Sequence, residues 1–343
     1  MTVALATTPD LLRLLVLPVF AWVAVRDIKT RRVSSEVWIP LAVLAGVLLV
    51  WDGWLAWEAG GTVWTHEFVL PAAISVGFVV PIAYLFWWFG GFGGADAKAL
   101  LVLAVLFPTI PQYTLGEVSL PLATPAIGAF SFTILVNAVL VGVLVPVALA
   151  IRNGAAGRFG AVMFVGWPIA WDRVPEAHGR LLETPAGISR GGLDLDALRM
   201  YLRWRGLTLA AVRDDPATYR DPATVPAEPN PPTDGAVTAD PRSDGGSPLE
   251  ATPGPDSRSE GDADRDSRPD PGTFDDPWGA EAFLEDIDHS AYGTTAEELR
   301  DGLDVLADAE TVWISPGTPF LVPIFVGLVI AFTYGDLLLG TLV

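Results

Sequence analysis

Six apolar stretches dominate the hydrophobic pattern of the chain. Each reaches or approaches the roughly 20 residues that a ~30 Å hydrocarbon layer requires. Stretches such as 101–107 and 138–150 lack the polar face that a water-exposed helix shows. The pattern therefore predicts an all-α polytopic membrane protein with about six transmembrane helices. These lie near Pro9–Val25, Val37–Trp54, Phe68–Phe89, Ala97–Ile110, Ala126–Ile151 and Thr318–Val343.

Two of the stretches need comment. The fourth has only 14 residues, which is short for a membrane span. We expect that tilt, local thinning of the bilayer or burial among neighbouring helices accommodates it. The first is not expected to be a cleavable signal peptide, because its basic cluster follows the apolar run and no small-residue cleavage site is present.

The distribution of Arg and Lys predicts the topology, because basic loops stay on the cytoplasmic side. The loops 52–67 and 109–125 contain no basic residue and are expected outside. Both termini then lie outside, with Arg13 able to snorkel to the outer surface. The loops expected inside contain Arg26, Lys29, Arg31 and Arg32, then Lys98, then Arg152 and Arg158.

The net charge of −19 is concentrated in one insert. Residues 171–316 contain 31 acidic residues and 13 arginines, a net of −18, whereas the other 197 residues have 9 acidic and 8 basic residues, a net of −1. The chain is thus a nearly neutral apolar body with an acidic, partly disordered cytosolic insert before the last helix. This distribution excludes a simple soluble enzyme.

The insert is itself expected to have several parts. Residues 159–169 are too short to span and are interfacial or packed against the bundle. Amphipathic helices are expected at 193–204, between an Asp194 cap and a Gly206 stop, and at 296–309, behind a Thr295–Glu298 capping box. Residues 214–277 contain 13 prolines and should be disordered. The expected organisation is a membrane core with five helices (1–151), a structured cytosolic or interfacial segment (152–213), a disordered acidic linker (214–280), an amphipathic helix region (281–315) and the last transmembrane helix (316–343).

The acidity permits two interpretations. Carboxylates spread over the cytosolic part, with only two lysines among 21 basic residues, favour a protein adapted to molar salt, where charge repulsion is screened. An acidic linker that binds a basic partner is the alternative. Nucleic acid is not expected as a partner, because the chain has no basic face. With no cysteine, thiol catalysis and Cys-based zinc sites are excluded.

Both lysines follow an aspartate by two residues, in Asp27-Ile28-Lys29 and Asp96-Ala97-Lys98. The predicted topology puts Asp27 at the end of the first helix and Asp96 at the start of the fourth, on the same side of the membrane. Two neighbouring carboxylates share a proton, so that one activates water and the other protonates the leaving group. The residues alone leave a second interpretation open, in which both are ordinary juxtamembrane charges beside lysines that set the topology.

The residues around the two aspartates resemble a known family. Gly93-Gly94-Ala95-Asp96-Ala97-Lys98 is similar to the Gly-x-Gly-Asp motif of intramembrane aspartyl proteases, and 27–33 is similar to the first motif of the archaeal type IV prepilin and preflagellin peptidases. The resemblance covers 11 to about 171 and the last helix, but no counterpart of the Pro-rich linker is expected. Ala95 replaces the glycine before the aspartate, and Val33-Ser34-Ser35 departs from the common Ile-Pro-Asn-like continuation.

The resemblance implies an aspartic-type endopeptidase that cuts the basic leader from prepilin-like or preflagellin precursors at the cytoplasmic face. Asp27 and Asp96 are then catalytic, and Gly93 and Gly94 make room for the substrate backbone. Lys29 and Lys98 tune the aspartates, bind lipid phosphates or simply set topology. No cofactor or metal is required. The alternatives are a signal-peptide-peptidase-like protease that cuts within helices, and a non-enzymatic transporter or scaffold.

Overall fold

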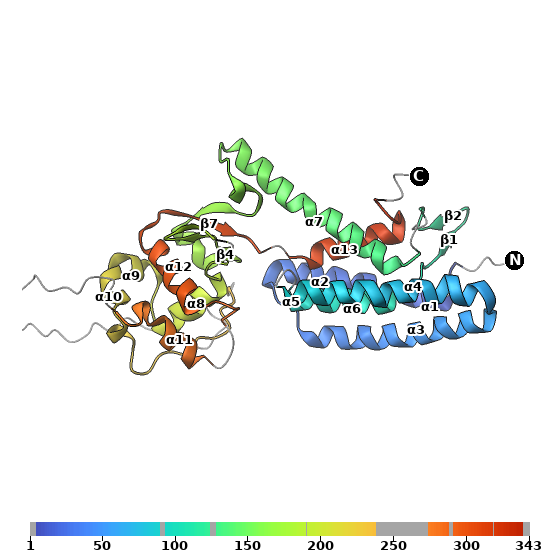
Figure 1. The fold of residues 1–343 in the computed structure, drawn as a ribbon, viewed down its shortest axis with the longest axis horizontal. Coiled ribbons are helices and arrows are strands. Elements are labelled where there is room, and N and C mark those ends of the chain that lie inside the picture. The colour runs from blue at the N-terminus through green and yellow to red at the C-terminus, as the bar shows by residue number, and fades with distance from the viewer. Residues whose placement is uncertain are drawn as a thin grey trace, which may run out of the picture. The chain divides into compact units, whose positions relative to one another are not determined.

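A computed structural model describes residues 5–89, 93–123, 128–189, 191–237, 274–287, 291–317 and 319–338. Contacts divide the chain into two compact units. The membrane unit comprises 1–152 and 318–343, and the insert unit comprises 153–317. Figure 1 shows the membrane unit as a bundle of long helices, and the insert unit as short helices around small sheets.

Helices form at each of the six predicted apolar stretches. Three helical segments within the described residues, Ser35–Ala59, Val63–Trp88 and Phe130–Ala155, are long and apolar enough to cross a membrane. The others are shorter, so the count of six spans stays a prediction, whereas a helical membrane protein is confirmed. The elements are α1 (Thr8–Arg13), α2 (Val16–Thr30), η1 (Ser35–Val37), α3 (Trp38–Ala59), η2 (Val63–Val69), α4 (Leu70–Ile74), η3 (Ser75–Val79), α5 (Val80–Trp88), α6 (Gly94–Leu106), α7 (Phe130–Ala155) and α13 (Leu321–Thr333).

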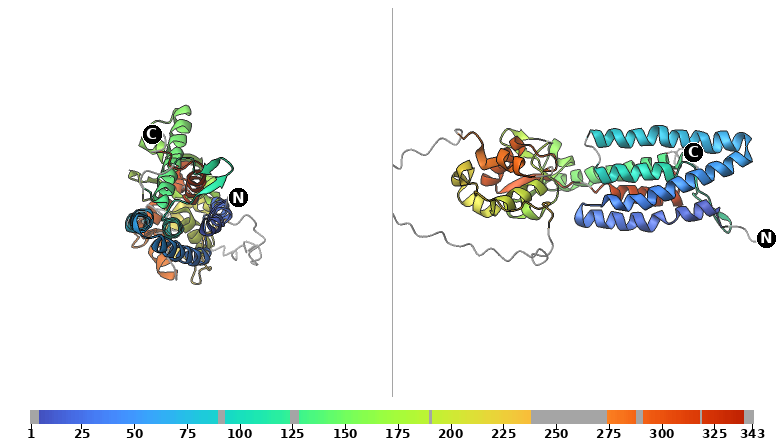
Figure 2. Two further views of the ribbon diagram at one scale, coloured as in Figure 1. Left: turned by 90° about the vertical axis from the view of Figure 1, so that its right-hand side faces the viewer. Right: turned by 90° about the horizontal axis from the view of Figure 1, so that it is seen from below.

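The fourth predicted span forms α6, which has 13 residues and is therefore about 20 Å long. Of the three ways to accommodate so short a helix, the structure favours burial, because seven α6 side chains are buried. Helices α3 and α5 pack against α6, and α13 packs against α2. Figure 2 shows the helices of this unit running roughly alongside one another. The buried α6 residues are Ala97, Ala99, Leu100, Val102, Leu103, Ala104 and Leu106.

The hairpin β1 (Tyr113–Leu115) and β2 (Val118–Leu120) lies at the end of the bundle where α6 and α13 finish. The N–H of Thr114 donates to the carbonyl oxygen of Leu5 (2.7 Å), and the N–H of Leu122 donates to that of Thr333 (3.1 Å). The first and last described parts of this unit therefore lie at the same end of the bundle.

The insert unit contains strands that the hydrophobic pattern did not predict. The central strand β7 (Thr311–Ser315) pairs antiparallel with β3 (Trp167–Ala170) and with β4 (Arg180–Leu181). These partners are separated by more than 100 residues along the chain, and short strands leave little periodicity to detect. The remaining elements are η4 (Ala161–Phe164), η5 (Trp171–Glu176), β5 (Glu183–Thr184), β6 (Gly187–Ile188), α8 (Leu195–Arg205), α9 (Leu209–Asp214), α10 (Pro216–Arg220), η6 (Pro222–Thr224), η7 (Pro277–Gly279), α11 (Ala280–Asp286) and α12 (Ala296–Asp308).

Both predicted amphipathic helices are confirmed as α8 and α12. The Asp194 side chain accepts a hydrogen bond from the N–H of Asp196 (2.9 Å), and Gly206 ends α8 in a left-handed conformation. Thr295 and Glu298 form the expected capping box before α12. The apolar faces of these two amphipathic helices are buried: Leu195, Leu198, Tyr201 and Leu202 on α8, and Leu299, Leu303 and Leu306 on α12.

The expected linker disorder does not extend over all of 214–280. Residues 214–237 include α10, and Trp278 is completely buried in the core of the insert unit. Its indole N–H donates to the Asp304 carboxylate (2.8 Å), and the carboxylate of Asp276 accepts from Arg300 (2.8 Å). Composition misses such anchors because a few buried aromatic and paired residues suffice to order a polar segment. The rest of the expected linker, 238–273, lies outside the described residues.

Charge pairing in this unit also shifts a pKa. Burial alone would raise the pKa of Asp276, but backbone N–H groups of Glu281 and Ala282 and the Arg300 guanidinium stabilise its carboxylate. The pKa of Asp276 is therefore held below its usual value.

Candidate active site

Asp27 lies in the last turn of α2 and is only 8% exposed. The backbone N–H of Leu321, the first residue of α13, stabilises the ionised carboxylate of Asp27. The unpaired N–H groups and the dipole at a helix N-terminus favour a negative charge. The start of the last helix thus holds the carboxylate contributed by an early helix.

Asp96 lies in the first turn of α6 and is partly buried. Its Oδ2 accepts a hydrogen bond from the N–H of Gly93 (3.0 Å), so the side chain caps its own helix. Residues 90–92, the first part of the glycine-rich run, lie outside the described residues.

The fold puts the two aspartates within electrostatic range of each other. Asp27 and Asp96 are 69 positions apart in the sequence, yet the Asp27 carboxylate interacts electrostatically with that of Asp96. The juxtaposition arises because α2 ends and α6 begins at the same end of the bundle. Two acidic groups in such proximity disfavour simultaneous ionisation, so one can keep a proton while the other remains a base.

The glycines before Asp96 differ in how closely they are confined. A Cβ placed on Gly93 would lie 3.1 Å from Oδ2 of Asp96, whereas a Cβ on Gly94 would meet only Nε1 of Trp87 at 3.9 Å. Gly93 adopts an extended conformation that any residue can adopt, so its constraint is the space beside the carboxylate. Ala95 is partly buried against the core of the bundle, where its methyl group is accommodated.

The described contacts of Lys29 and Lys98 do not involve the carboxylates of Asp27 or Asp96. Lys98 donates from Nζ to Oγ of Ser35 in η1 (2.6 Å), which links the start of α6 to the start of α3. Lys29 is exposed on α2. The lysines accompany both aspartates in sequence, but nothing in these contacts assigns them a chemical role.

The cation that interacts with Asp27 is Arg31. Arg31 ends α2 in a left-handed conformation (φ 55°), and its N–H donates to the carbonyl oxygen of Asp27 (3.0 Å). In the sequence, Arg31 is evident only as a topology signal and as part of the first motif. Its spacing of four residues from Asp27 is a usable signal, because side chains four apart meet on a helix.

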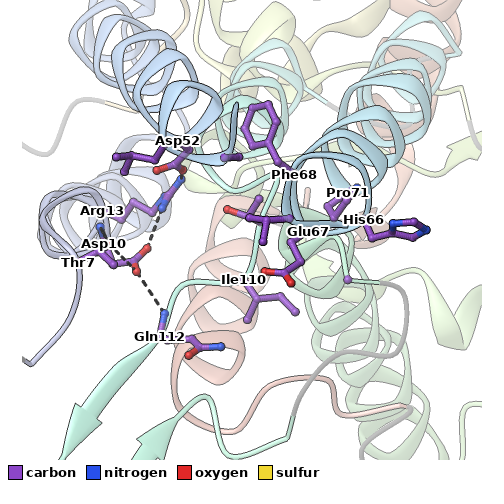
Figure 3. A pocket seen from close by; sticks show the side chains of 15 residues that line it. Thr7, Asp10, Arg13, Asp52, His66, Glu67, Phe68, Pro71, Ile110 and Gln112 are labelled. Atoms are coloured by element: carbon purple, nitrogen blue, oxygen red, sulfur yellow. Dashed lines mark hydrogen bonds and ion pairs between the residues drawn. The ribbon is translucent and has the colours of Figure 1, made fainter. Parts of the chain in front are cut away.

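The opposite end of the bundle contains a second polar cluster, shown in Figure 3. Arg13 is 1% exposed and contacts the carboxylates of Asp10 and Asp52, and its Nε donates to the carbonyl oxygen of Leu106 (2.9 Å). The snorkelling expected for Arg13 is wrong, because these acceptors inside the bundle satisfy its guanidinium.

A cavity of about 530 Å³ adjoins this cluster. Its lining includes Asp10, Arg13, Asp52, Glu67 and Gln112 (Figure 3). The Asp10–Arg13–Asp52 contacts join α1 to α3 and so account for these buried charges structurally. The cavity lies at the end of α6 remote from Asp96, because Leu106 ends that helix.

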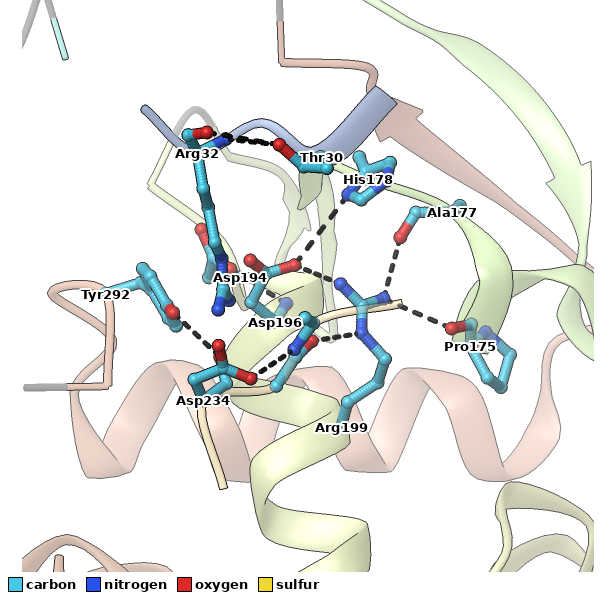
Figure 4. A network of polar contacts seen from close by, with 12 residues as sticks. Thr30, Arg32, Pro175, Ala177, His178, Asp194, Asp196, Arg199, Asp234 and Tyr292 are labelled. Carbon is cyan, nitrogen blue, oxygen red and sulfur yellow. Dashed lines mark hydrogen bonds and ion pairs between the residues drawn. The ribbon is translucent and has the colours of Figure 1, made fainter. Parts of the chain in front are cut away.

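A polar network in the insert unit, drawn in Figure 4, is likewise structural. Arg199 of α8 contacts Asp196 and donates to the carbonyl oxygens of Ala177 (2.8 Å) and Pro175 (3.2 Å). These bonds fasten the end of η5 and the residue that follows it to α8. Burial raises the pKa of the neighbouring Asp194, which caps the same helix. Within the described ranges, no cluster of three or more His, Cys, Asp or Glu is arranged to hold a metal ion.

Comparisons with known proteins match the two regions that flank the Pro-rich linker. A model of the type IV leader peptidase family matches residues 14–150, which include Asp27 and Asp96. A model described as the archaeal peptidase A24 C-terminus, type II, matches 280–337. The second match covers α12 and β7 as well as α13, and so extends beyond the last helix in which the sequence resemblance resumes.

Two curated relatives are similar to the same part of the chain. A preflagellin peptidase of Methanocaldococcus jannaschii is 26% identical over 138 residues, and one of Methanococcus voltae is 30% identical over 140 residues. Each alignment covers 39% of this chain and 54% of the relative. The chain thus spans about half the length of the curated relatives it matches.

Proposed function

We propose that the chain is a membrane-embedded aspartic-type endopeptidase of the type IV leader peptidase family, whose model matches residues 14–150. Its substrates are precursors of type IV pilins or archaeal flagellins, from which it removes the short basic leader. The observation that carries the proposal is the electrostatic interaction between the carboxyl groups of Asp27 and Asp96, the two aspartates of the family-like motifs.

In the proposed reaction the two carboxyl groups share one proton. The ionised group takes a proton from a water molecule, which attacks the scissile carbonyl carbon, and the protonated group supports the developing oxyanion and then the leaving amine. The N–H groups of Leu321 and Gly93 hold the two carboxylates in position. Arg31 acts as a positioning residue through its charge beside Asp27.

The place of the aspartates along their helices favours this activity over the alternatives. Asp27 lies in the last turn of α2 and Asp96 in the first turn of α6, rather than midway along either helix. A protease that cuts inside the hydrocarbon layer needs its acids deeper. A transporter needs polar groups or broken helices near mid-membrane, whereas the long helix α3 is apolar over its central turns.

The proposal includes an orientation. The basic residues near the end of α2, Lys98 and Arg152 support an orientation with the aspartates at the cytoplasmic face of the cell membrane and both termini outside. A precursor with a basic leader and an apolar helix can then present its cleavage site at that face while the helix remains in the lipid.

The test is processing of a co-expressed type IV prepilin or preflagellin in high salt, measured by the shortening of the precursor on a gel. Asp27→Asn and Asp96→Asn each remove one titratable carboxyl with little change in shape. We expect each variant to lower the processing rate by about 100-fold or more, because neither aspartate alone supplies both acid and base.

Glu36→Gln is the matched control, since Glu36 is an exposed carboxylate in η1 near the start of α3. It should process the precursor at the rate of the wild type, with all variants compared at equal membrane abundance. Full processing by either aspartate variant would contradict the proposed chemistry. A wild type inactive on several precursors would contradict the proposed substrate class.

A further inference from the structure

The turn that follows α7 is apolar and yet exposed. Residues 156–166, here called the apolar turn, read Ala-Gly-Arg-Phe-Gly-Ala-Val-Met-Phe-Val-Gly and contain one polar side chain, Arg158. Phe159 is 80% exposed, Phe164 50% and Val165 40%. In Figure 1 the chain turns back on itself at this end of α7. Phenylalanines so exposed in an ordered turn indicate a surface that is covered in the working protein.

The apolar turn is held in a defined shape by the last turns of α7. Asn153 is fully buried, and its Nδ2 donates to the carbonyl oxygens of Met163 (2.9 Å) and Gly166 (2.8 Å). The N–H of Arg158 donates to the carbonyl oxygen of Asn153 (2.9 Å). Because the buried side chain of Asn153 ties the second half of the turn to the helix and its carbonyl oxygen holds the first half, the exposed phenylalanines are presented by the fold.

The turn also continues an exposed apolar face of α7. Leu144, Val147 and Ile151 are 62%, 46% and 68% exposed, and their spacing of three and four residues puts them on one face. Gly154 follows on that face, and a Cβ placed there would meet Cε of Met163 at 3.7 Å and Cε1 of Phe159 at 3.8 Å. The side chains of the turn thus cover Gly154.

Lipid is the occupant that fits this surface. Helix α7 has 26 residues, about 39 Å, and is apolar enough to cross a bilayer, so its end reaches the boundary between acyl chains and headgroups. The surface of α7 up to Ile151 would face acyl chains, and the phenylalanines come directly after it. Arg152 and Arg158 flank the junction, where basic side chains meet lipid phosphates.

We propose that the apolar turn is a membrane-interface anchor. Phe159, Phe164 and Val165 insert into the acyl–headgroup boundary of the bilayer that α7 enters, and Arg158 lies at the level of the lipid phosphates. This role is separate from catalysis and does not depend on the proposed peptidase activity.

The test uses the absence of cysteine from the natural chain. Phe159→Cys and Phe164→Cys each introduce one thiol, which is labelled with a nitroxide in the full-length protein reconstituted in bilayers. Collisions with oxygen, which concentrates in lipid, and with a water-soluble nickel chelate then report depth. We expect oxygen collisions to dominate at both positions, with labels about 5–10 Å below the headgroup surface. Ile188→Cys is the matched control, since Ile188 is an apolar residue that is 57% exposed in β6; there the nickel chelate should dominate.

Two outcomes would overturn the proposal. Labels at 159 and 164 that collide with the nickel chelate as often as the label at 188 would put the turn in water. Immobile labels shielded from both reagents would mean that protein covers it. Thermal unfolding of the variants in detergent, expected to match the wild type, checks that the substitutions leave the fold intact.

Discussion

At the scale of single residues, the candidate site depends on which backbone groups hold each carboxylate. The backbone N–H of Leu321 stabilises the carboxylate of Asp27, and the N–H of Gly93 donates a hydrogen bond to the carboxylate of Asp96. The chemistry-bearing residues were identifiable from sequence, because both are acids at apolar boundaries beside the chain's only lysines. Leu321 was not identifiable, since nothing in its local sequence reports a contact with a residue almost 300 positions earlier.

Gly93 and Gly94 differ in the space available to an added methyl group, and this difference gives a testable prediction. Only Gly93 is closely surrounded. In Gly93→Ala the new methyl group lies 3.1 Å from Oδ2 of Asp96, so the carboxylate or the helix start must shift. We expect precursor processing to fall by about 10- to 100-fold, since small displacements of catalytic groups have effects of that size. Processing is measured at equal membrane abundance.

Gly94→Ala is the control within the same motif, because the methyl group there makes only ordinary contact with Trp87. Its rate of precursor processing should stay within about twofold of the wild-type rate. Equal loss in both variants, or a loss confined to Gly94→Ala, would mean that the space beside Asp96 is not what the motif preserves.

At the scale of elements, the membrane helices lie where the apolar stretches predicted, but their packing depends on details that periodicity does not contain. Helix α6 is short and buried. Helix α13 packs closely against α7 at Gly327. In the insert unit, α8 and α12 were predictable from their caps and apolar faces, whereas β3 and β7 were not. A cap acts within four residues, but a strand pair requires a partner from another part of the chain.

Because α13 approaches α7 closely, we expect one added methyl group at this contact to lower the stability of the protein strongly. A Cβ on Gly327 would lie 2.6 Å from the backbone nitrogen of Ala138, which cannot move without displacing α7. We expect Gly327→Ala to lower the free energy of unfolding by about 1–3 kcal/mol, because overpacking forces the helices apart. Thermal unfolding in detergent is the measurement.

Gly46→Ala provides the comparison, since Gly46 also lies within an apolar helix but has no atom within 4 Å of an added Cβ. Its unfolding temperature should equal or exceed that of the wild type. If Gly327→Ala were equally harmless, the α7–α13 contact would be looser than the structure describes.

At the scale of the whole molecule, charge and hydrophobicity are divided between two units. The membrane unit has little net charge, while residues 171–316 have a net of −18. The insert unit nevertheless has a well-packed core, in which Trp204, Trp278 and Phe283 are buried. Its carboxylates therefore repel one another on the surface of an ordered fold.

This repulsion predicts that salt stabilises the insert unit. Raising KCl from 0.1 M to 1 M shortens the screening length from about 10 Å to about 3 Å, so repulsion between exposed carboxylates declines. We expect the unfolding temperature to rise, by about 2–4 °C for each kcal/mol gained. The measurement is thermal unfolding of the full chain, followed by the fluorescence of its tryptophans.

A variant with less surface charge tests the cause. Glu228, Glu297 and Asp308 are exposed in the insert unit, and replacing them by Gln, Gln and Asn should reduce the response to salt. An unchanged response in that variant, or a wild type that salt does not stabilise, would contradict the expectation of a salt-adapted protein.

The sequence by itself determined what depends on local composition and spacing. Apolar length predicted the membrane helices, caps and apolar faces predicted α8 and α12, and the two aspartate motifs predicted the candidate catalytic residues. Only the tertiary structure decided what depends on contacts between distant segments. It brought Asp27 near Asp96 and the start of α13, turned Arg13 into the bundle, paired β3 with β7, and ordered Trp278 within a Pro-rich region. The physical reason is that hydrophobic burial and helix capping act on neighbours in sequence, whereas these contacts exist only after the chain has closed loops of tens to hundreds of residues.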